Sequence, residues 1–261
     1  MIEKVNPSHP DKIADRIAGA LVDLAYKKSN NPKIAVEILI GHGLCTIINE
    51  SSIDINLKEV DRVVKRIVGE IEIRYIKVTQ DLELSKNQEG DVKAGDNGIF
   101  KGIPVDEEVE KLSLIAKEIY KKHPSDGKYV LDLKSNRIII CQSKTTDVIL
   151  EQEYNKIVNP LGYWDGGLNV DTGATNRKLG SDMGRAVTGG GIHGKDLSKA
   201  DVSVNLYAHI KAQETREEVN ICCAIGDSNV DELPYNEIVE IARVFIEKKG
   251  GFEKLAEWGI V

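Results

Sequence analysis

Three consecutive glycines, Gly189 to Gly191, interrupt a basic stretch that runs from Asn176 to Asp201. Glycine has no side chain to bury and loses more backbone entropy on folding than any other residue, so this stretch cannot form part of a packed core. Such a run does allow main-chain N–H groups to come close to an anion. Cationic side chains on both sides would add charge suited to phosphate oxygens; they are Arg177, Lys178, Arg185, Lys195 and Lys199.

Two further features favour a polyphosphate cradle over a flexible, solvated glycine loop. Asp196 and Asp201 stand within the basic run, where a phosphate site that also holds a divalent cation needs carboxylates. Leu197, Ser198 and Lys199 lead into a helix-like run, which puts the loop at a helix N-terminus, where anions are favoured.

Length and composition describe an ordinary globular protein. A chain of 261 residues can bury a substantial core in one or two domains. The net charge of −7 argues against a general nucleic-acid or membrane binder, and no apolar run reaches membrane-spanning length. The N-terminal stretch lacks the apolar region of a secretory signal, so we expect a cytoplasmic protein. Its four cysteines lack C-x-x-C spacing, and we expect buried, reduced thiols rather than disulfides or zinc ligands.

Helix and strand patterns alternate along the chain. A first helix begins near Pro10, with Ser8 as its expected cap. Further helices are expected at 57–71, 105–122, 146–158, 198–213, 235–249 and 252–258. Strands are expected at 33–40, 44–48, 75–79, 128–133, 137–142 and 219–225. The polar segment 85–98 is expected to be a loop, and Glu50 is expected just beyond the second strand.

These patterns predict the α+β class. Many strands look like hairpin partners rather than strands joined by a crossover helix. We therefore expect three similar, interleaved blocks of helices and mostly antiparallel strands, packed as one body. They are an N-terminal block at 1–98, a reduced central block at 99–158, and a C-terminal block with the glycine-rich phosphate loop at 159–261.

Several polar residues stand where structure alone would not require them. His9 precedes the first helix. Capping of that helix would account for Asp11 but accounts poorly for His9. Glu37, among apolar residues, lies either on a solvated strand face or in the core beside a cation. Asp96, Lys128 and Asp171 follow or occupy turns, so each could be either an ordinary turn residue or part of a site.

The order of these motifs resembles that of the S-adenosylmethionine synthetase (methionine adenosyltransferase) family. His-Pro-Asp-Lys-Ile-Ala-Asp at 9–15 is similar to the family's N-terminal signature, and 94–98 to its AGDQG motif. Asn159-Pro160-x-Gly162 resembles the NPxG turn, and 189–196 the GGGxxSGKD loop. The spacing of Lys195, Lys199 and Asp201 also matches, as does the 13-residue interval from Glu37 to Glu50. The likeness runs from His9 to about Asp227.

The resemblance implies a role for each matching residue. Triphosphate would be held by His9, Lys128, Arg177, Lys178 and Lys195, with His9 as a cationic donor to the leaving oxygen. Of these, the catalytic residues would be His9, Lys128, Arg177 and Lys195. Asp126 would bind ATP, and Asp171 would lie near its nucleoside. Either Tyr163 or Trp164 would stack on adenine, with Trp164 preferred. Methionine would be positioned by Glu50, Gln88, Asp96, Asp171 and Lys199.

The resemblance also implies the activity and its cofactors. ATP, L-methionine and water would give S-adenosylmethionine, phosphate and diphosphate. Magnesium, with two ions expected, would be bound by Asp11 and Asp201, one of them shared between the first helix and the last glycine loop. Potassium would be bound by Glu37. The family places its active site between two subunits, so we expect a homodimer, which could pair into a tetramer.

Departures from the family pattern leave two alternatives open. Only Glu89 to Lys93 separate Gln88 from Ala94, so the loop before the AGDQG-like motif is short. Residues 191–194 are one residue shorter than the family's version, and residues 170–176 differ from its GDxGLTG motif. A triphosphatase that has lost methionine recognition would keep the cradle. A non-catalytic nucleotide-binding subunit would have no need of the metal-binding aspartates.

Overall fold

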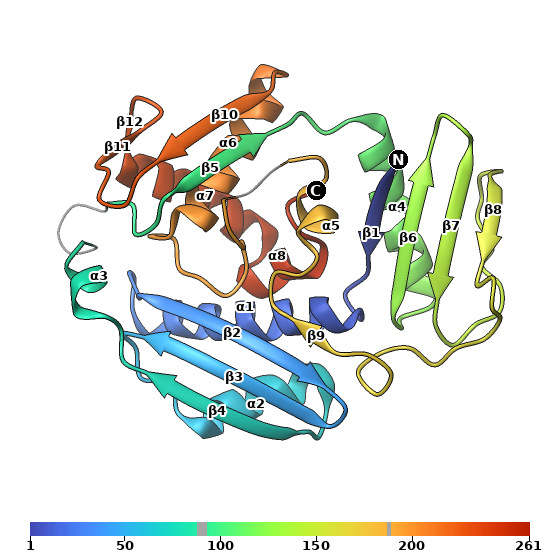
Figure 1. The fold of residues 1–261 in the computed structure, drawn as a ribbon, viewed down its shortest axis with the longest axis horizontal. Coiled ribbons are helices and arrows are strands. Elements are labelled where there is room, and N and C mark those ends of the chain that lie inside the picture. The colour runs from blue at the N-terminus through green and yellow to red at the C-terminus, as the bar shows by residue number, and fades with distance from the viewer. Residues whose placement is uncertain (88–92, 187–188) are drawn as a thin grey trace.

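The computed structural model describes residues 1–87, 93–186 and 189–261. Its strands form two four-stranded sheets and two short pairs, and the helices pack around them (Figure 1). The helices are α1 (Pro10–Lys28), α2 (Leu57–Val68), α3 (Leu82–Asn87), α4 (Glu107–Lys122), α5 (Leu179–Met183), α6 (Ala200–Thr215), α7 (Tyr235–Lys249) and α8 (Phe252–Trp258).

The first sheet has the order β4-β3-β2-β9. It consists of β2 (Ile34–Gly41), β3 (Leu44–Ser51), β4 (Glu72–Val78) and the short β9 (Gly173–Ala174). Alternate residues of β2 are buried, as expected for a strand with one face on a core. Helices α1 and α2 lie behind this sheet in Figure 1, and the opposite face is open.

The second sheet has the order β1-β6-β7-β8 and packs against α4. Its strands are β1 (Ile2–Val5), β6 (Gly127–Asp132), β7 (Arg137–Gln142) and β8 (Asn155–Val158). The remaining strands form two pairs, β5 (Gly98–Gly102) with β10 (Val219–Cys223), and β11 (Asn229–Val230) with β12 (Leu233–Pro234).

Most of these strand pairs are antiparallel, and β3–β4 and β7–β8 are parallel. The mixture of helices and mainly antiparallel sheets confirms the α+β class. Pairing also crosses the ranges expected for the three blocks, because β1 joins β6 and β9 joins β2. The block boundaries stay a prediction.

Two apolar cores hold the elements together. The larger lies between β2, β3 and the helices α1, α6, α7 and α8. The smaller lies between α4 and the sheet that contains β6 and β7. Among the described residues, no helix is both long and apolar enough to cross a membrane.

Segment 146–158 differs from the expected helix. Its last residues form β8, which pairs with β7 from Arg137 opposite Asn155 to Ile140 opposite Val158. The edge strand β7 has backbone N–H and C=O groups that hydrogen-bond to a fourth strand. The apolar residues Val148, Ile149 and Leu150 are consecutive, so they do not form the apolar stripe of an amphipathic helix. The helix prediction was wrong because tertiary pairing decided this segment.

Four smaller predictions also need correction. The cap of α1 is His9 rather than Ser8, whose hydroxyl instead lies 3.0 Å from that of Tyr120. Residues 82–87 form α3, and Gly98 starts β5, so the segment expected to be a loop contains two elements. Glu50 lies within β3. All four cysteines are free, but Cys222 is exposed rather than buried.

Candidate active site

Asp11 is the centre of a charged group at the N-terminus of α1. Its buried carboxylate accepts a hydrogen bond from the backbone N–H of Ala174 at 2.9 Å, and its other oxygen lies 2.5 Å from Nζ of Lys178. The guanidinium of Arg177 is 3.5 Å from the same carboxylate. Gly173 makes this approach possible, because a Cβ there would stand 2.0 Å from the carbonyl oxygen of Pro10. The structure therefore gathers three of the predicted site residues.

His9 completes the start of the helix. Its Nδ1 accepts a hydrogen bond from the backbone N–H of Asp11 at 3.2 Å, which leaves the proton of a neutral ring on Nε2. Burial and the nearby charge of Lys178 lower the pKa of His9 to about 4. The ring is therefore neutral at pH 7, which replaces the expectation of a cation. It can still donate a hydrogen bond through Nε2.

Further carboxylates lie around the same helix start. Asp126 accepts a hydrogen bond from the N–H of Gly167 at 2.8 Å. Burial, with a contribution from the charges of Asp171 and Asp11, raises the pKa of Asp126 to about 6. Asp171 is exposed and accepts from the N–H of Thr172 at 2.7 Å. We call His9, Asp11, Asp126, Asp171, Arg177 and Lys178 together the Asp11 group.

Lys128 lies on β6, opposite Val5. Its ammonium group is half-exposed and 3.0 Å from a carboxylate oxygen of Glu3. Its charge also acts to lower the pKa of His9, so the side chain is electrostatically close to the Asp11 group.

A second charged group lies at the N-terminus of α6. Asp201 is buried in the first turn of that helix and pairs with the ammonium group of Lys195. Burial raises the pKa of Asp201, opposed by Lys195 and reinforced by Asp96, whose side chain is hydrogen-bonded to it. Lys199 is the cap residue of α6. We call Asp96, Lys195, Lys199 and Asp201 together the Asp201 group.

The absence of a side chain on Gly190 allows the triple-glycine segment to contact the Asp201 group. A Cβ on Gly190 would lie 2.4 Å from both carboxylate oxygens of Asp201. The expectation that the loop meets a helix N-terminus is confirmed, because α6 begins at Ala200. The oxygen ligands available here suit a hard cation such as Mg²⁺, which would relieve the repulsion between Asp96 and Asp201.

Strand β2 connects the two groups. Lys195 bridges to Ala35, while Ala174, the hydrogen-bond donor to Asp11, is opposite Leu39. Four residues of strand separate these positions, which corresponds to about 13 Å. Within one chain the groups therefore occupy different stretches of β2. Sharing of one Mg²⁺ by Asp11 and Asp201 stays a prediction. It would require Asp11 of one copy of the chain to meet Asp201 of a second copy.

Glu37 lies between the two groups. Its side chain is on the exposed face of β2, and its carboxylate accepts a hydrogen bond from the hydroxyl of Thr175. Of the two positions considered for this residue, the solvated strand face is the one observed. An exposed carboxylate with a neighbouring hydroxyl oxygen offers suitable ligands for a monovalent cation.

The residues expected to position methionine divide between the two ends of β2. Glu50 is opposite Ala35, and its carboxylate accepts from the N–H of Asp81 at 3.4 Å. It therefore lies beside the Lys195 end, where Asp96 and Lys199 also lie. Asp171 belongs to the other end. Gln88 lies outside the described residues.

Two aromatic residues follow the turn at Asn159. The indole N–H of Trp164 lies 3.3 Å from Oδ1 of Asn159, and its ring packs against Gly166. The Tyr163 ring is exposed, and its hydroxyl lies 3.3 Å from Asp165. The hydrogen bond from Gly167 to Asp126 holds this segment near the Asp11 group. Trp164 is thus partly occupied by structural contacts, while the Tyr163 ring is exposed to solvent.

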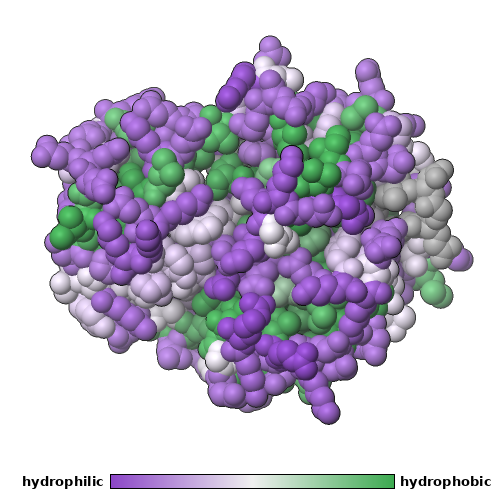
Figure 2. All heavy atoms as spheres, turned by 180° about the vertical axis from the view of Figure 1, so that it is seen from behind, coloured by the Kyte–Doolittle hydropathy of each residue, from purple (hydrophilic) through white to green (hydrophobic). Residues whose placement is uncertain are grey.

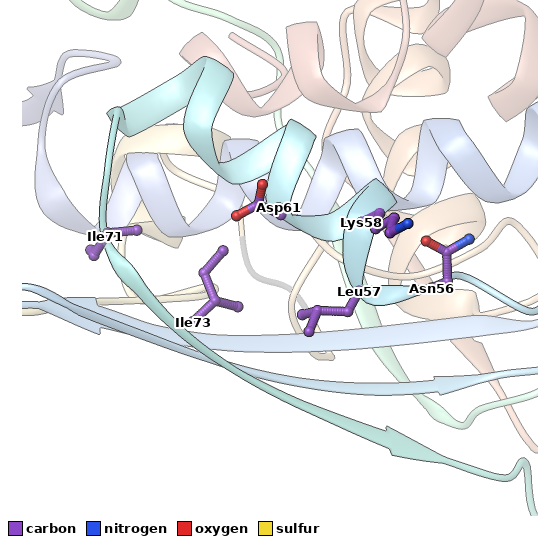
Figure 3. A pocket seen from close by; sticks show the side chains of 6 residues that line it. All are labelled: Asn56, Leu57, Lys58, Asp61, Ile71 and Ile73. Carbon is purple, nitrogen blue, oxygen red and sulfur yellow. The ribbon is translucent and has the colours of Figure 1, made fainter.

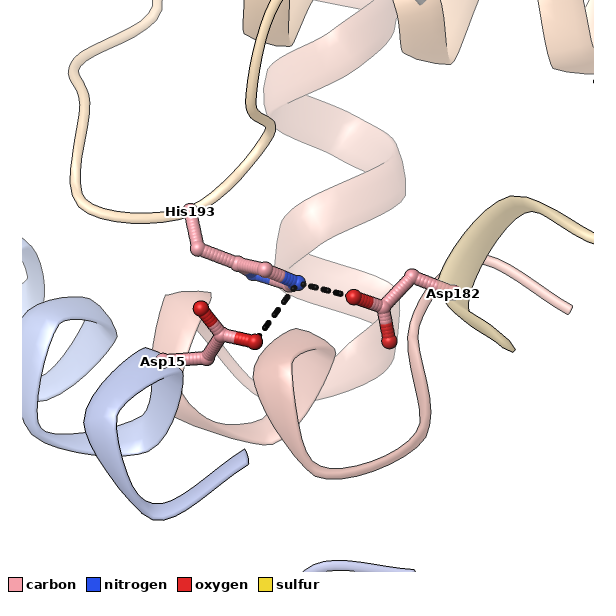
Figure 4. A group of neighbouring side chains, drawn as sticks. All are labelled: Asp15, Asp182 and His193. Carbon is pink, nitrogen blue, oxygen red and sulfur yellow. Dashed lines mark hydrogen bonds and ion pairs between the residues drawn. The ribbon is translucent and has the colours of Figure 1, made fainter. Parts of the chain in front are cut away.

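The structure reveals a buried charged cluster to which sequence reasoning gave no role. It consists of Lys12 and Asp15 on α1, Asp182 on α5, and His193 in the glycine-rich segment. Figure 4 shows the two carboxylates converging on the imidazole from different elements. The Nζ atom of Lys12 lies 3.1 Å from Asp15, 2.5 Å from Asp182 and 3.3 Å from His193. Lysine and aspartate three residues apart on a helix gave the available signal.

The cluster has the ligand types of a metal site, but Lys12 already supplies its cation. Burial opposes the charge on Lys12, yet Asp182 and Asp15 raise the pKa of its ammonium group. Burial likewise opposes ionisation of Asp182, and Lys12 and His193 lower the pKa of that carboxyl. The cluster is therefore an internal ion network.

A large recess lies elsewhere in the structure. It has a volume of about 830 Å³ and is lined by α2 and the edge strand β4, with Leu57 and Ile73 between them (Figure 3). Its lining residues, Asn56, Leu57, Lys58, Asp61, Ile71 and Ile73, include none of the described candidate site residues. The described members of both charged groups therefore lie outside this recess.

Comparison with known proteins agrees with the resemblance found in the sequence. The family model for the S-adenosylmethionine synthetase N-terminal domain matches residues 1–89. An S-adenosylmethionine synthase from Salinibacter ruber is 26% identical, with 94% of this chain and 85% of the relative covered. The chain is a short relative of the S-adenosylmethionine synthetases.

Two further comparisons extend this result. An S-adenosylmethionine synthase from Mycoplasma mycoides is 29% identical, with 87% of this chain and 77% of the relative covered. The structure of an unusual S-adenosylmethionine synthetase from Campylobacter jejuni matches with a TM-score of 0.78 at 18% identity. That match covers all of this chain and 93% of the other, so the whole fold is shared with a synthetase. At this identity the likeness concerns the fold.

Proposed function

We propose that this protein is a methionine adenosyltransferase that makes S-adenosylmethionine from ATP and L-methionine. The observation that carries the proposal is the Asp11 group, in which His9, Arg177 and Lys178 converge on the start of α1. In addition, the relatives that cover most of the chain are S-adenosylmethionine synthases.

The reaction needs charge stabilisation more than proton transfer. The methionine sulfur would form a bond to C5′ of ATP as the bond from C5′ to the triphosphate oxygen breaks, which gives a sulfonium product and free triphosphate. Water would then cleave triphosphate to phosphate and diphosphate. Fixed donors directed at a leaving group contribute about 10²–10³ in rate for each strong contact. Arg177, Lys178 and Lys195 would supply this charge, and neutral His9 would donate through Nε2.

The carboxylates fit the metals that the family implies. Asp11 and Asp201 would hold Mg²⁺, and Glu37 would hold K⁺, since all three offer oxygen ligands. The divalent ion would supply charge neutralisation on the phosphates. Lys178 and Lys195, which now pair with Asp11 and Asp201, would turn to the phosphate oxygens when the substrate is bound.

A homodimer would unite the two charged groups. The face of the β2–β3–β4 sheet that carries Glu37 and Glu50 also exposes apolar side chains in register, namely Leu39, Ile48, Ile76 and Val78. An exposed apolar sheet face of this kind is typical of an interface. Figure 2 shows the opposite side of the whole molecule, where most exposed side chains are hydrophilic and the apolar ones lie in separate patches. Pairing through a two-fold axis would bring the Asp11 group of one copy towards the Asp201 group of the other.

The decisive assay uses purified protein with ATP, Mg²⁺ and K⁺, with and without methionine, followed by mass spectrometry. We expect S-adenosylmethionine, phosphate and diphosphate, all dependent on methionine. Release of phosphate from ATP or triphosphate without any adenosyl transfer would instead identify a triphosphatase. Binding of ATP without any turnover would identify a nucleotide-binding subunit.

A further inference from the structure

The buried cluster of Lys12, Asp15, Asp182 and His193 connects α1, the Arg177–Lys178 segment and the glycine-rich segment, which carry most of the candidate phosphate ligands. These four side chains are at most 2% exposed and come from α1, α5 and the glycine-rich segment. No residue of the cluster was given a role in the proposed reaction. Its contacts nevertheless lead to both charged groups.

The first connection runs to the basic residues after β9. Asp15 accepts a hydrogen bond from the backbone N–H of Asn176 at 2.7 Å, directly before Arg177 and Lys178. The backbone N–H of Asp182 donates to the carbonyl of Lys178 at 3.0 Å. Both ends of the Arg177–Lys178 segment are therefore held by members of the cluster.

The second connection runs to the glycine-rich segment. Asn176 uses its side chain to bind the backbone of His193 on both sides, at 2.9 Å to the N–H and 3.1 Å to the carbonyl. His193 itself lies 2.9 Å from Asp182 through Nε2. Two residues later, Lys195 starts the Asp201 group. Gly191 leaves room for this contact, since a Cβ there would collide with the Asn176 amide at 2.1 Å.

We propose that His193 is a positioning residue, which with Lys12, Asp15 and Asp182 fixes the distance between the Arg177–Lys178 segment and the Lys195 segment. The inference rests on the proposed function, because it assigns both segments to triphosphate binding. In the proposed dimer each segment of one chain faces the complementary segment of the other copy, so their separation within the chain sets the geometry of both sites. Through Asp182, the imidazole locks the glycine-rich segment to α5. Without that contact the segment would still join β2 through the hydrogen bond from Val36 to Gly194, but its preceding residues would lose their link to α5.

The test compares His193→Leu with His193→Gln. Leucine has a similar size but no polar atom, whereas glutamine keeps an N–H donor near the position of Nε2. A misplacement of about 1 Å costs about 10²-fold in turnover, so we expect His193→Leu to lower kcat by at least tenfold with a smaller change in KM for ATP. We expect His193→Gln to recover most of the loss.

Asp23→Ala provides the matched control. Asp23 also lies on α1 and accepts two backbone N–H groups from another element, those of Phe252 and Glu253, at 2.8 and 3.0 Å. It should lower the melting temperature without changing kcat. If His193→Leu lowers the melting temperature but keeps the wild-type kcat, or if leucine and glutamine behave alike, the positioning role is wrong.

A second measurement separates this inference from the proposed activity. The binding of inorganic triphosphate can be measured by calorimetry in the presence of Mg²⁺, and this measurement needs no methionine. We expect His193→Leu to weaken this binding at least tenfold relative to wild type and to His193→Gln. If the wild type makes no S-adenosylmethionine but this difference appears, the proposed function fails and the positioning role survives. Equal binding by all three proteins would overturn the positioning role.

Discussion

The ammonium group of Lys178 lies 2.5 Å from a carboxylate oxygen of Asp11, although 167 residues separate them in the chain. This contact joins the start of α1 to the basic segment that precedes α5. It places a cation and a potential metal ligand side by side, with Arg177 3.5 Å from the same carboxylate.

Replacement of Lys178 by alanine should lower kcat for adenosyl transfer by about 10²–10³, the usual effect of losing one strong contact to developing negative charge. The measurement is the steady-state rate of S-adenosylmethionine formation. Lys27→Ala is the control, because Lys27 is an exposed cation in the last turn of α1, at the opposite end of that helix from Asp11. A loss below threefold would show that Lys178 does not contact the triphosphate.

His9 should make folding depend on pH. Its pKa is lowered to about 4 in the folded protein, against about 6.5 in the unfolded chain. Between these values the unfolded chain binds more protons, so the contribution to the free energy of unfolding is present above pH 6.5 and is lost as pH falls towards 4.

Replacement of His9 by asparagine, which can still cap a helix, should flatten this part of the pH dependence. Chemical denaturation at pH 4.5 and pH 7 would give the difference from wild type. His42→Gln is the control, since that histidine is exposed. Equal slopes for His9→Asn and wild type would mean that the folded imidazole titrates normally.

Replacement of Gly190 by alanine should disrupt the Asp201 group. The new Cβ would lie 2.4 Å from the carboxylate oxygens, so Asp201 would have to move. We expect binding of Mg²⁺-ATP to weaken by at least tenfold in calorimetry. At Gly180 a Cβ would meet nothing within 4 Å, and Gly180→Ala should bind as wild type does. Unchanged binding by Gly190→Ala would remove Asp201 from the site.

Replacement of Ile48 by aspartate should split the proposed dimer. Ile48 is 45% exposed and directly opposite Glu37 on β2, in the middle of the apolar sheet face. Light scattering should show a monomer, and turnover should fall because the Asp11 group of one copy would no longer face the Asp201 group of the other. Ile149→Asp changes an isoleucine that is even more exposed, at 76%, on a different surface and should leave the dimer intact. A dimer that persists in Ile48→Asp would place the interface elsewhere.

Local sequence patterns were sufficient for most helices, because α1, α2, α4, α7 and α8 carry clear caps or apolar stripes. They failed at β8, which depends on the free edge of β7, and at β5, whose partner β10 lies far along the chain. The residue motifs identified Asp11, Lys178, Lys195 and Asp201, and the structure joins these in pairs. The sequence could not show the separation of the two pairs along β2, nor that burial leaves His9 neutral, since both depend on tertiary packing.

Strand β1 has a consequence for the order of events during synthesis. Its residues Ile2–Val5 pair with residues of β6 that follow more than 120 positions later, from Leu131 back to Lys128. In a nascent chain leaving the ribosome, β1 therefore stays unpaired until residues 128–131 have emerged. Long-range pairing of this kind slows folding and prolongs exposure of the unpaired edge. Since His9 and Asp11 directly follow β1, the start of α1 acquires its final surroundings only after β6 and the segment with Ala174 and Lys178 have been synthesised.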